Sequence, residues 1–255
     1  MIPEVFAQIK KTLNDQSVDY ENIINSFGQV SAYEERKKGT SFILSEHIKG
    51  LIYSYLSNQR PWGSIAENLN IIDEIFFYYD PKKLKEVNPS SLIESIRKIK
   101  CGNRNITSQI NNLSYNIERF EKIESGFGSV DAFITSGSPE SIASELGKGK
   151  KYKFKEVGFT LAMEYLRNVG INAIKPDLHI CRIIGPERLS LIQKTPTPEE
   201  AYNALMKWED EVDDCAIYID NLLWIFAAKD YGNICSAKPK CHLCSVEKCK
   251  RKSFS

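Results

Sequence analysis

Four cysteines near the end of the chain have the spacing that most clearly indicates chemistry. They are Cys235, Cys241, Cys244 and Cys249, in the pattern C-x5-C-x2-C-x4-C. Four thiolates this close in sequence can enclose one compact centre, either a tetrahedral metal ion or an iron–sulfur cubane. Zinc ribbons usually pair two separate C-x2-C knuckles, and this segment contains only one. The spacing therefore predicts a metal centre and leaves its kind open.

A single carboxylate is the second candidate for chemistry. Asp177 closes the stretch Lys175-Pro176-Asp177 and precedes a segment with helical apolar spacing. Pro176 disfavours a helical conformation for Lys175, and an aspartate in this place can cap a helix that begins at Leu178. Taken alone, Asp177 is most simply a helix N-cap.

The residues before Asp177 form a recognisable pattern. A tight turn at Val157-Gly158 leads into a helix with apolar residues from Leu161 to Val169, which ends at Gly170. This pattern resembles the helix-hairpin-helix DNA glycosylases of the endonuclease III type, whose hairpin reads roughly L-P-G-V-G-x-K-T-A and precedes a V-D-T-H-V-x-R stretch. Here the aspartate, histidine and arginine of that stretch correspond to Asp177, His179 and Arg182.

The resemblance implies an enzyme that flips a modified or mispaired base out of DNA and hydrolyses its N-glycosidic bond. Breaking that bond builds positive charge on the sugar, and a nearby carboxylate stabilises the charge and orients or deprotonates an attacking water. We therefore predict that Asp177 is catalytic. Oxidised, alkylated and deaminated bases are all compatible with the pattern. The small-residue position Ser54 disfavours the adenine-excising branch of the family, which carries a glutamate there.

One residue of the family pattern is missing. The hairpin lysine of bifunctional members attacks the sugar and forms a Schiff base that leads to strand cleavage. Its place here falls on Gly158, Phe159 or Thr160, none of which is lysine. We expect a monofunctional glycosylase that uses water. The alternatives are a bifunctional glycosylase/lyase with a displaced lysine, Lys153 or Lys155, and a non-catalytic iron–sulfur protein that binds DNA.

The resemblance also implies the residues that contact DNA. Backbone N–H groups at the hairpin would approach a phosphate, and Leu56-Ser57-Asn58-Gln59 resembles the family's L-S-x-Q, whose glutamine fills the gap left by the flipped base. Tyr53 and Trp62 are candidates for the base pocket or for the core. The expected DNA-binding residues are Gln59, Lys153, Lys155, Val157, Gly158, Thr160 and His179.

The cysteine segment is similar to the family's C-x6-C-x2-C-x5-C iron–sulfur loop, with both outer spacers one residue shorter. This similarity favours a [4Fe–4S] cluster over zinc. Its implied role is structural: it holds a basic loop against the phosphate backbone.

Alternation of apolar residues with period two is almost absent, so the sequence predicts an all-α fold. Apolar segments over 65–79 and 106–123 are among the expected helical regions, the second ending at Gly126-Phe127-Gly128. By the resemblance, residues 46–172 form a six-helix domain that contains the hairpin. Residues 1–45 and 173–255 then form the iron–sulfur domain, with a DNA-binding cleft between the two.

The chain has 255 residues and a formal net charge of +1, which excludes a globally basic nucleic-acid binder. A DNA-binding face must be local, and Gly147–Lys155 carries five lysines and no acid. We find no signal peptide or membrane-spanning run, and unevenly spread cysteines argue against a secreted disulfide framework. We expect a cytoplasmic monomer, associated with the nucleoid if the source is prokaryotic, that binds double-stranded DNA carrying an altered base.

Overall fold

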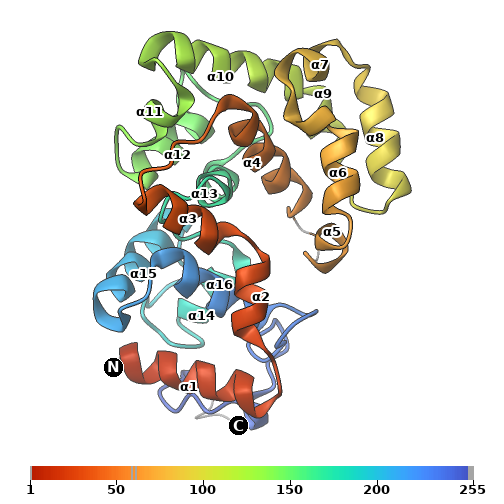
Figure 1. Ribbon diagram of the computed structural model, residues 1–255. Helices are drawn as coiled ribbons and strands as arrows, with labels where there is room; N and C mark the ends of the chain where they lie inside the picture. The colour runs from red at the N-terminus through yellow and green to blue at the C-terminus, as the bar shows by residue number, and fades with distance from the viewer. Residues whose placement is uncertain (1, 59, 61, 252–255) are drawn as a thin grey trace. The chain divides into compact units, whose positions relative to one another are not determined.

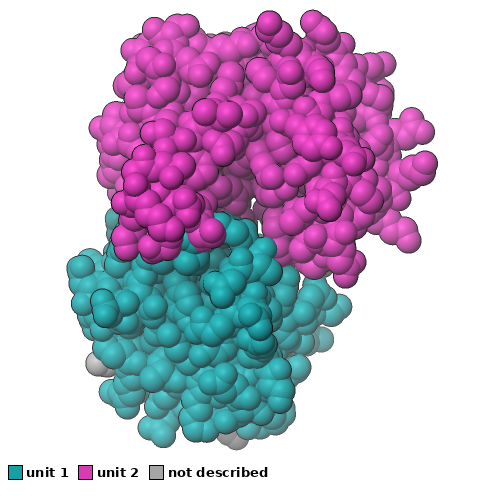
Figure 2. Space-filling view, viewed as in Figure 1, with its two compact units in different colours: residues 1–30, 172–255 teal, residues 31–171 magenta. Residues whose placement is uncertain are grey.

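The computed structural model describes residues 2–58, 60 and 62–251. These residues form sixteen α-helices and two 3₁₀ helices and contain no β-strand, so the predicted all-α class is confirmed. The chain divides into two compact units, which Figure 2 colours separately. Unit 1 is residues 1–30 with 172–255, and unit 2 is residues 31–171. Both ends of the chain therefore belong to unit 1.

Unit 2 contains the helices from the middle of the chain, and Figure 1 shows α13 lying between α4 and α12. Gly50 in α4 permits the close approach, because a Cβ at this position would lie 2.8 Å from Cγ1 of Val169. The helices are α3 (Gln29–Lys37), α4 (Leu44–Leu56), α5 (Gly63–Ala66), α6 (Leu69–Ile75), η1 (Phe77–Tyr79), α7 (Pro81–Glu86), α8 (Pro89–Lys98), α9 (Ile106–Asn111), α10 (Leu113–Phe127), α11 (Val130–Ile134), α12 (Pro139–Lys148) and α13 (Phe159–Asn168).

A polar network lies within the apolar core of unit 2. His47 is fully buried, and its Nδ1 lies 2.8 Å from the hydroxyl of Tyr165. Arg36 donates two hydrogen bonds to the carboxylate of Asp131, at 3.1 and 2.8 Å. Burial alone would raise the pKa of Asp131, but the ring of His47, whose Nε2 lies 3.5 Å from Oδ1, and the hydrogen bonds from Arg36 outweigh it and hold that pKa well below its ordinary value. The network thus fixes α3, α4, α11 and α13 together.

Unit 1 is built around α16, most of whose residues are buried. Its aromatic core includes the edge-to-face pair Phe6–Trp208, with ring centroids 6.4 Å apart. Because Phe6 belongs to α1, this pair joins the first helix to the C-terminal half of the chain. The helices are α1 (Ile2–Asp15), α2 (Tyr20–Ser26), α14 (Leu178–Ile184), α15 (Pro198–Val212), α16 (Ala216–Ala227) and η2 (Cys241–Leu243).

Two expected helical regions differ from the structure. The single helix predicted over 106–123 is wrong, since α9 and α10 meet at Asn112, whose backbone is not helical (φ −100°, ψ 6°). Its predicted end is confirmed, because α10 stops at Phe127 and Gly128 follows with φ 84°. The 65–79 region is broken into α5, α6 and a left-handed turn over Phe77–Tyr79.

Candidate active site

Asp177 begins α14 in unit 1 as its N-cap. Its Oδ1 accepts hydrogen bonds from the backbone N–H groups of His179 and Ile180, at 2.7 and 3.1 Å. These bonds satisfy two of the donors that a helix start leaves unpaired and fix the orientation of the carboxylate. Within the described part of the chain, the second oxygen, Oδ2, accepts no hydrogen bond. The side chain is half-buried, so this oxygen remains available to a ligand.

Two further polar groups lie on the same short helix. Burial lowers the pKa of His179, and the charges of Arg182 and Lys175 lower it further, while Asp177 opposes the shift. Nδ1 of His179 and Nη1 of Arg182 are buried and find no hydrogen-bond partner among the described residues. The ring of His179 lies edge-on to that of Trp224, with centroids 6.4 Å apart. Helix α14 therefore carries a carboxylate at its N-cap, a neutral imidazole in its first turn and, in its last turn, a guanidinium with one unpaired nitrogen.

The predicted hairpin in unit 2 is formed by α12, a ten-residue connection over 149–158, and α13. Gly147 makes its tight packing possible, because a Cβ there would lie 2.8 Å from the backbone nitrogen of Phe159. Gly158 is the N-cap of α13, provides no side-chain cap and has open space around its Cα. The start of α13 is thus left without a side-chain cap, an arrangement suited to an anion.

The connection itself is held by a buried side chain from α10. Asn116 is fully buried. Its Oδ1 accepts the backbone N–H of Lys155 at 2.8 Å, and its Nδ2 donates to the carbonyl of Lys155 at 3.0 Å. The same Nδ2 donates to the hydroxyl of Tyr55 at 2.6 Å. This clamp fixes the backbone just before Glu156, which takes a left-handed conformation with φ 61°.

The side chains of the hairpin segregate clearly. Val157 and Phe159 are buried, Thr160 is half-buried, and Gly158 is exposed. The five lysines of 147–155 are all exposed, and Lys155 Nζ lies 4.2 Å from the ring centroid of Tyr115. Together they form a local positive surface on unit 2, made of Lys148, Lys150, Lys151, Lys153 and Lys155.

Two predicted base-pocket residues in unit 2 lie beside each other. The rings of Tyr53 and Trp62 are 6.0 Å apart at the centroids. The hydroxyl of Tyr53 donates to Asp73 at 3.0 Å, and Asp73 also pairs with Lys49 at 3.2 Å. Both aromatic side chains are half-buried. Gln59 lies outside the described residues.

Solved structures of DNA glycosylases share this architecture. The 8-oxoguanine glycosylase/lyase of Methanocaldococcus jannaschii, in complex with DNA containing 8-oxoguanine, superposes with a TM-score of 0.58 at 19% identity, over 88% of this chain and 96% of that one. The 8-oxoguanine DNA glycosylase of Thermotoga maritima superposes with a TM-score of 0.59 at 15% identity, over 89% and 97%. The chain has a DNA-glycosylase fold. It matches no model of a protein family, and no curated protein is similar enough in sequence to count as a relative.

The predicted site residues that the structure describes are divided between the two units. Asp177, His179 and the four cysteines belong to unit 1, while the hairpin, Tyr53 and Trp62 belong to unit 2.

The four cysteines of unit 1 lie in a loop that is fastened at several points. Its start is paired with the end of α16, since Cys235 N donates to Phe226 O at 3.0 Å. Its end is paired with α1, where Ser245 N donates to Oγ1 of Thr12 at 2.9 Å and Lys248 pairs with Glu4 at 2.7 Å. In Figure 1 the C-terminal segment runs beside α1. The loop is therefore anchored to α16 at its start and to α1 at its end.

The first thiol of this loop, that of Cys235, is affected by the other three. The pKa of Cys235 is raised to about 12, chiefly by burial; the charge of Arg188 opposes this shift, and the other three cysteines of the loop add to it. Among the residues that the structure describes, no group of three or more histidine, cysteine, aspartate or glutamate side chains is arranged to hold a single metal ion. A [4Fe–4S] cluster uses one cysteine for each iron, so its ligands stand further apart than those of one ion.

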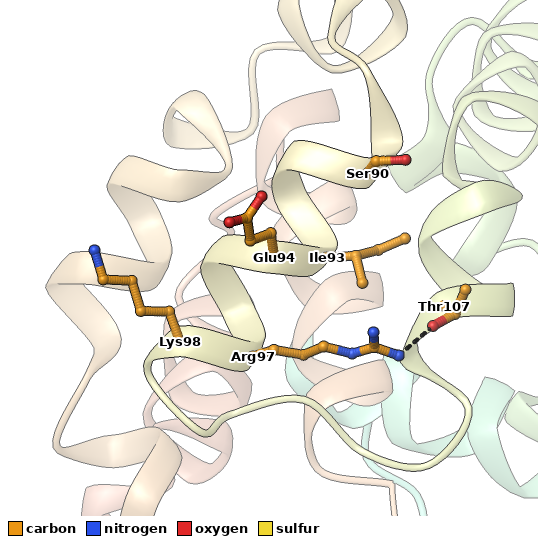
Figure 3. Close-up of a pocket in the computed structure, with 6 residues that line it drawn as sticks. All are labelled: Ser90, Ile93, Glu94, Arg97, Lys98 and Thr107. Atoms are coloured by element: carbon orange, nitrogen blue, oxygen red, sulfur yellow. Dashed lines mark hydrogen bonds between the residues drawn. The ribbon is translucent and has the colours of Figure 1, made fainter.

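A hollow of about 580 Å³ on unit 2 is lined by none of these residues (Figure 3). Arg97 reaches across it and donates to Oγ1 of Thr107 at 2.7 Å. Its lining residues are Ser90, Ile93, Glu94, Arg97, Lys98 and Thr107. Since none of them belongs to the hairpin or to α14, this hollow is not the predicted site.

Over the described ranges, no helix has the length and apolar character needed to cross a membrane.

Sequence reasoning missed two residues that shape the hairpin, Asn116 and Gly147. Asn116 lies on the apolar face of α10, one residue before Ile117 and four before Phe120, both buried. A polar residue at a buried helical position indicates that its side chain makes a hydrogen bond within the protein, and the sequence contains this signal for Asn116. Gly147 shows no such signal, because its need for a missing Cβ depends on how α12 meets α13.

Proposed function

We propose that this protein is a DNA glycosylase of the base excision repair type, which extrudes a modified or mispaired base and hydrolyses its N-glycosidic bond. The observation that carries the proposal is the Asp177 carboxylate, held at the start of α14 with Oδ2 left without a described partner, in a chain with a DNA-glycosylase fold. The negative carboxylate would stabilise the cationic sugar that forms as the base leaves. It would also orient the water that attacks the sugar.

We further propose that the enzyme is monofunctional. Positions 158–160, where the family's lysine falls, are occupied by Gly158, Phe159 and Thr160. The exposed Lys153 and Lys155 are better suited to phosphate contacts, because lysines attract the backbone of DNA without regard to sequence. The hairpin amides at Gly158 would bind one phosphate. Gln59 would fill the gap left by the extruded base.

A panel of duplexes, each with one altered base, tests both proposals. We expect strand cleavage only after alkali or heat, which breaks the DNA at the abasic product. The panel should include 8-oxoguanine, which the similar glycosylases of known structure recognise. Cleavage without alkali, together with a covalent adduct trapped by borohydride, would show a lyase and overturn the monofunctional proposal. Failure on every altered base, with DNA binding intact, would instead favour a non-catalytic DNA-binding protein.

We also propose that Cys235, Cys241, Cys244 and Cys249 hold a [4Fe–4S] cluster. The four-thiol donor set supports a shared centre, as does the effect of the other three thiols on Cys235. When bound, the cluster would supply structural cross-linking of the loop rather than a step of the reaction. Visible absorption with equal amounts of iron and acid-labile sulfide is the expected result. Zinc without sulfide would overturn this assignment and leave the glycosylase proposal untouched.

A further inference from the structure

A buried arginine lies beside both ends of the cysteine loop. Arg188 follows α14 and is only 4% exposed. Its Nη2 donates to the carbonyl of Ser236, directly after Cys235, at 3.2 Å. Its own carbonyl accepts the N–H of Lys250, directly after Cys249, at 2.8 Å. One residue is therefore bonded next to the first and the last cysteine of the loop.

The rest of this guanidinium lacks a partner. Nε and Nη1 of Arg188 are buried, and neither finds a hydrogen-bond acceptor among the described residues. No ion pair joins Arg188 to a carboxylate in that part of the chain; the neighbouring Glu187 pairs with Arg251 instead. A guanidinium stays charged in proteins, and a buried charge without a counter-charge is strongly destabilising. The guanidinium of Arg188 therefore needs a negatively charged partner.

The cysteine loop can supply that anion. Four thiolates around the core of a [4Fe–4S] cluster leave the centre with a net negative charge, and its sulfurs accept hydrogen bonds. The guanidinium lies beside the first of these cysteines, because its Nη2 is bonded to the carbonyl of Ser236, the residue that follows Cys235. No other group in the described part of unit 1 offers compensation of this kind to Nε and Nη1.

We propose that Arg188 is the counter-charge of the four-cysteine cluster and donates from Nε and Nη1 to its sulfurs. It is a positioning residue, and the inference rests on the cluster assignment above. Because reduction adds negative charge to the cluster, a nearby guanidinium stabilises the reduced form and raises the midpoint potential. It also draws the two ends of the loop together, which slows the loss of iron.

The test compares the full-length protein, purified without oxygen, with three variants. Arg188→Gln removes the charge, and Arg188→Lys keeps the charge but not the planar set of donors. Lys250→Gln is the control, because it removes one positive charge beside Cys249 from an exposed side chain and keeps the backbone bond to Arg188. The readouts are the midpoint potential of the cluster and the rate at which visible absorption decays in air.

We expect Arg188→Gln to have a more negative midpoint potential and a several-fold faster decay, Arg188→Lys to be intermediate, and Lys250→Gln to match the wild type. If Arg188→Gln loads little cluster, the potential of the loaded fraction and the lysine variant still decide the matter. A loaded Arg188→Gln that matches Lys250→Gln in both readouts would overturn the role of Arg188 alone. Wild-type protein without iron and sulfide would overturn it together with the cluster assignment. The duplex assay reports on glycosylase activity separately.

Discussion

Asp177 has two roles that a pair of substitutions can separate. Asparagine retains an oxygen that can accept the two amide hydrogen bonds of α14, but it lacks the negative charge. We expect Asp177→Asn to change the unfolding free energy by less than about 0.5 kcal/mol and to slow base excision by two to three orders of magnitude, roughly the effect of removing one electrostatic group. Asp177→Ala should lose activity and also about 1 kcal/mol of stability.

Single-turnover excision and chemical unfolding measure the two effects. Excision by Asp177→Asn at the wild-type rate would show that the carboxylate is only a helix cap.

His179 makes the stability of unit 1 depend on pH. Its folded pKa lies below the usual 6.5 because the ring is buried, so the unfolded chain binds more protons as the pH falls. The stability associated with the neutral ring is present above the unfolded pKa and is lost as the pH falls below it. We expect the wild type to lose more unfolding free energy between about pH 7.5 and about pH 5.5 than His179→Gln does. Urea titrations at the two pH values measure the unfolding free energy, and an equal loss in the wild type and in His179→Gln would contradict this prediction.

At the scale of the element, the clamp on the hairpin connection makes the next prediction. Asn116→Ala leaves the N–H and carbonyl of Lys155 without their partner and opens a space against Tyr55. Unpaired buried groups and a cavity together lower stability by about 2–4 kcal/mol. Since the connection carries the lysines, we also expect weaker binding of duplex DNA. Urea unfolding and fluorescence anisotropy measure the two effects.

Asn112→Ala is the matched control, because Asn112 lies one turn earlier in the chain, is only half-buried and bonds only locally to the carbonyl of Ser108. A loss of stability as small in Asn116→Ala as in this control would show that the connection holds its shape without the clamp.

The elements that could be predicted from sequence are those whose signals are local. The turn at Val157-Gly158 and the helical spacing of apolar residues in α13 predict the hairpin, and the glycines after α10 predict where that helix ends. The break at Asn112 could not be read, because apolar spacing continues across it and tertiary packing decides where the helix stops. The left-handed turn over Phe77–Tyr79 is equally hidden. Bulky residues rarely take positive φ, and buried Phe76 and Tyr79 hold it, with rings stacked 6.3 Å apart.

At the scale of the whole molecule, the chain is nearly neutral, with a formal net charge of +1, but its charges are separated along the sequence.

The features that the sequence predicts are short motifs: Asp177, the hairpin and the cysteine loop. Asn116 shows only the general signal of a polar residue on an apolar helix face, and Arg188 shows none; neither can be assigned to its motif from the sequence, since each acts on residues far away in the chain. The division of the chain also depends on such distant contacts. Residues 31–45, which the family pattern assigned to the terminal domain, belong to the compact unit of residues 31–171.

The local positive surface of the hairpin predicts how binding to DNA depends on salt. Each lysine that neutralises a phosphate releases a counterion, so the logarithm of the binding constant falls with the logarithm of the salt concentration by about 0.9 for each contact. Lys151 and Lys153 are exposed and have no described carboxylate partner. We expect the double variant Lys151→Gln/Lys153→Gln to bind more weakly and to have a slope smaller by about 1.8.

The control carries the same change of net charge elsewhere on unit 2. Lys37 and Lys38 in and after α3 are also exposed, but they pair with Glu34 and Glu35 at 3.5 and 3.0 Å. Lys37→Gln/Lys38→Gln should therefore leave the slope at its wild-type value, because its lysines belong to another surface. Anisotropy titrations of one duplex at several salt concentrations give all three slopes. If both double variants reduce the slope equally, DNA senses only the total charge of the protein, and the hairpin is not its binding surface.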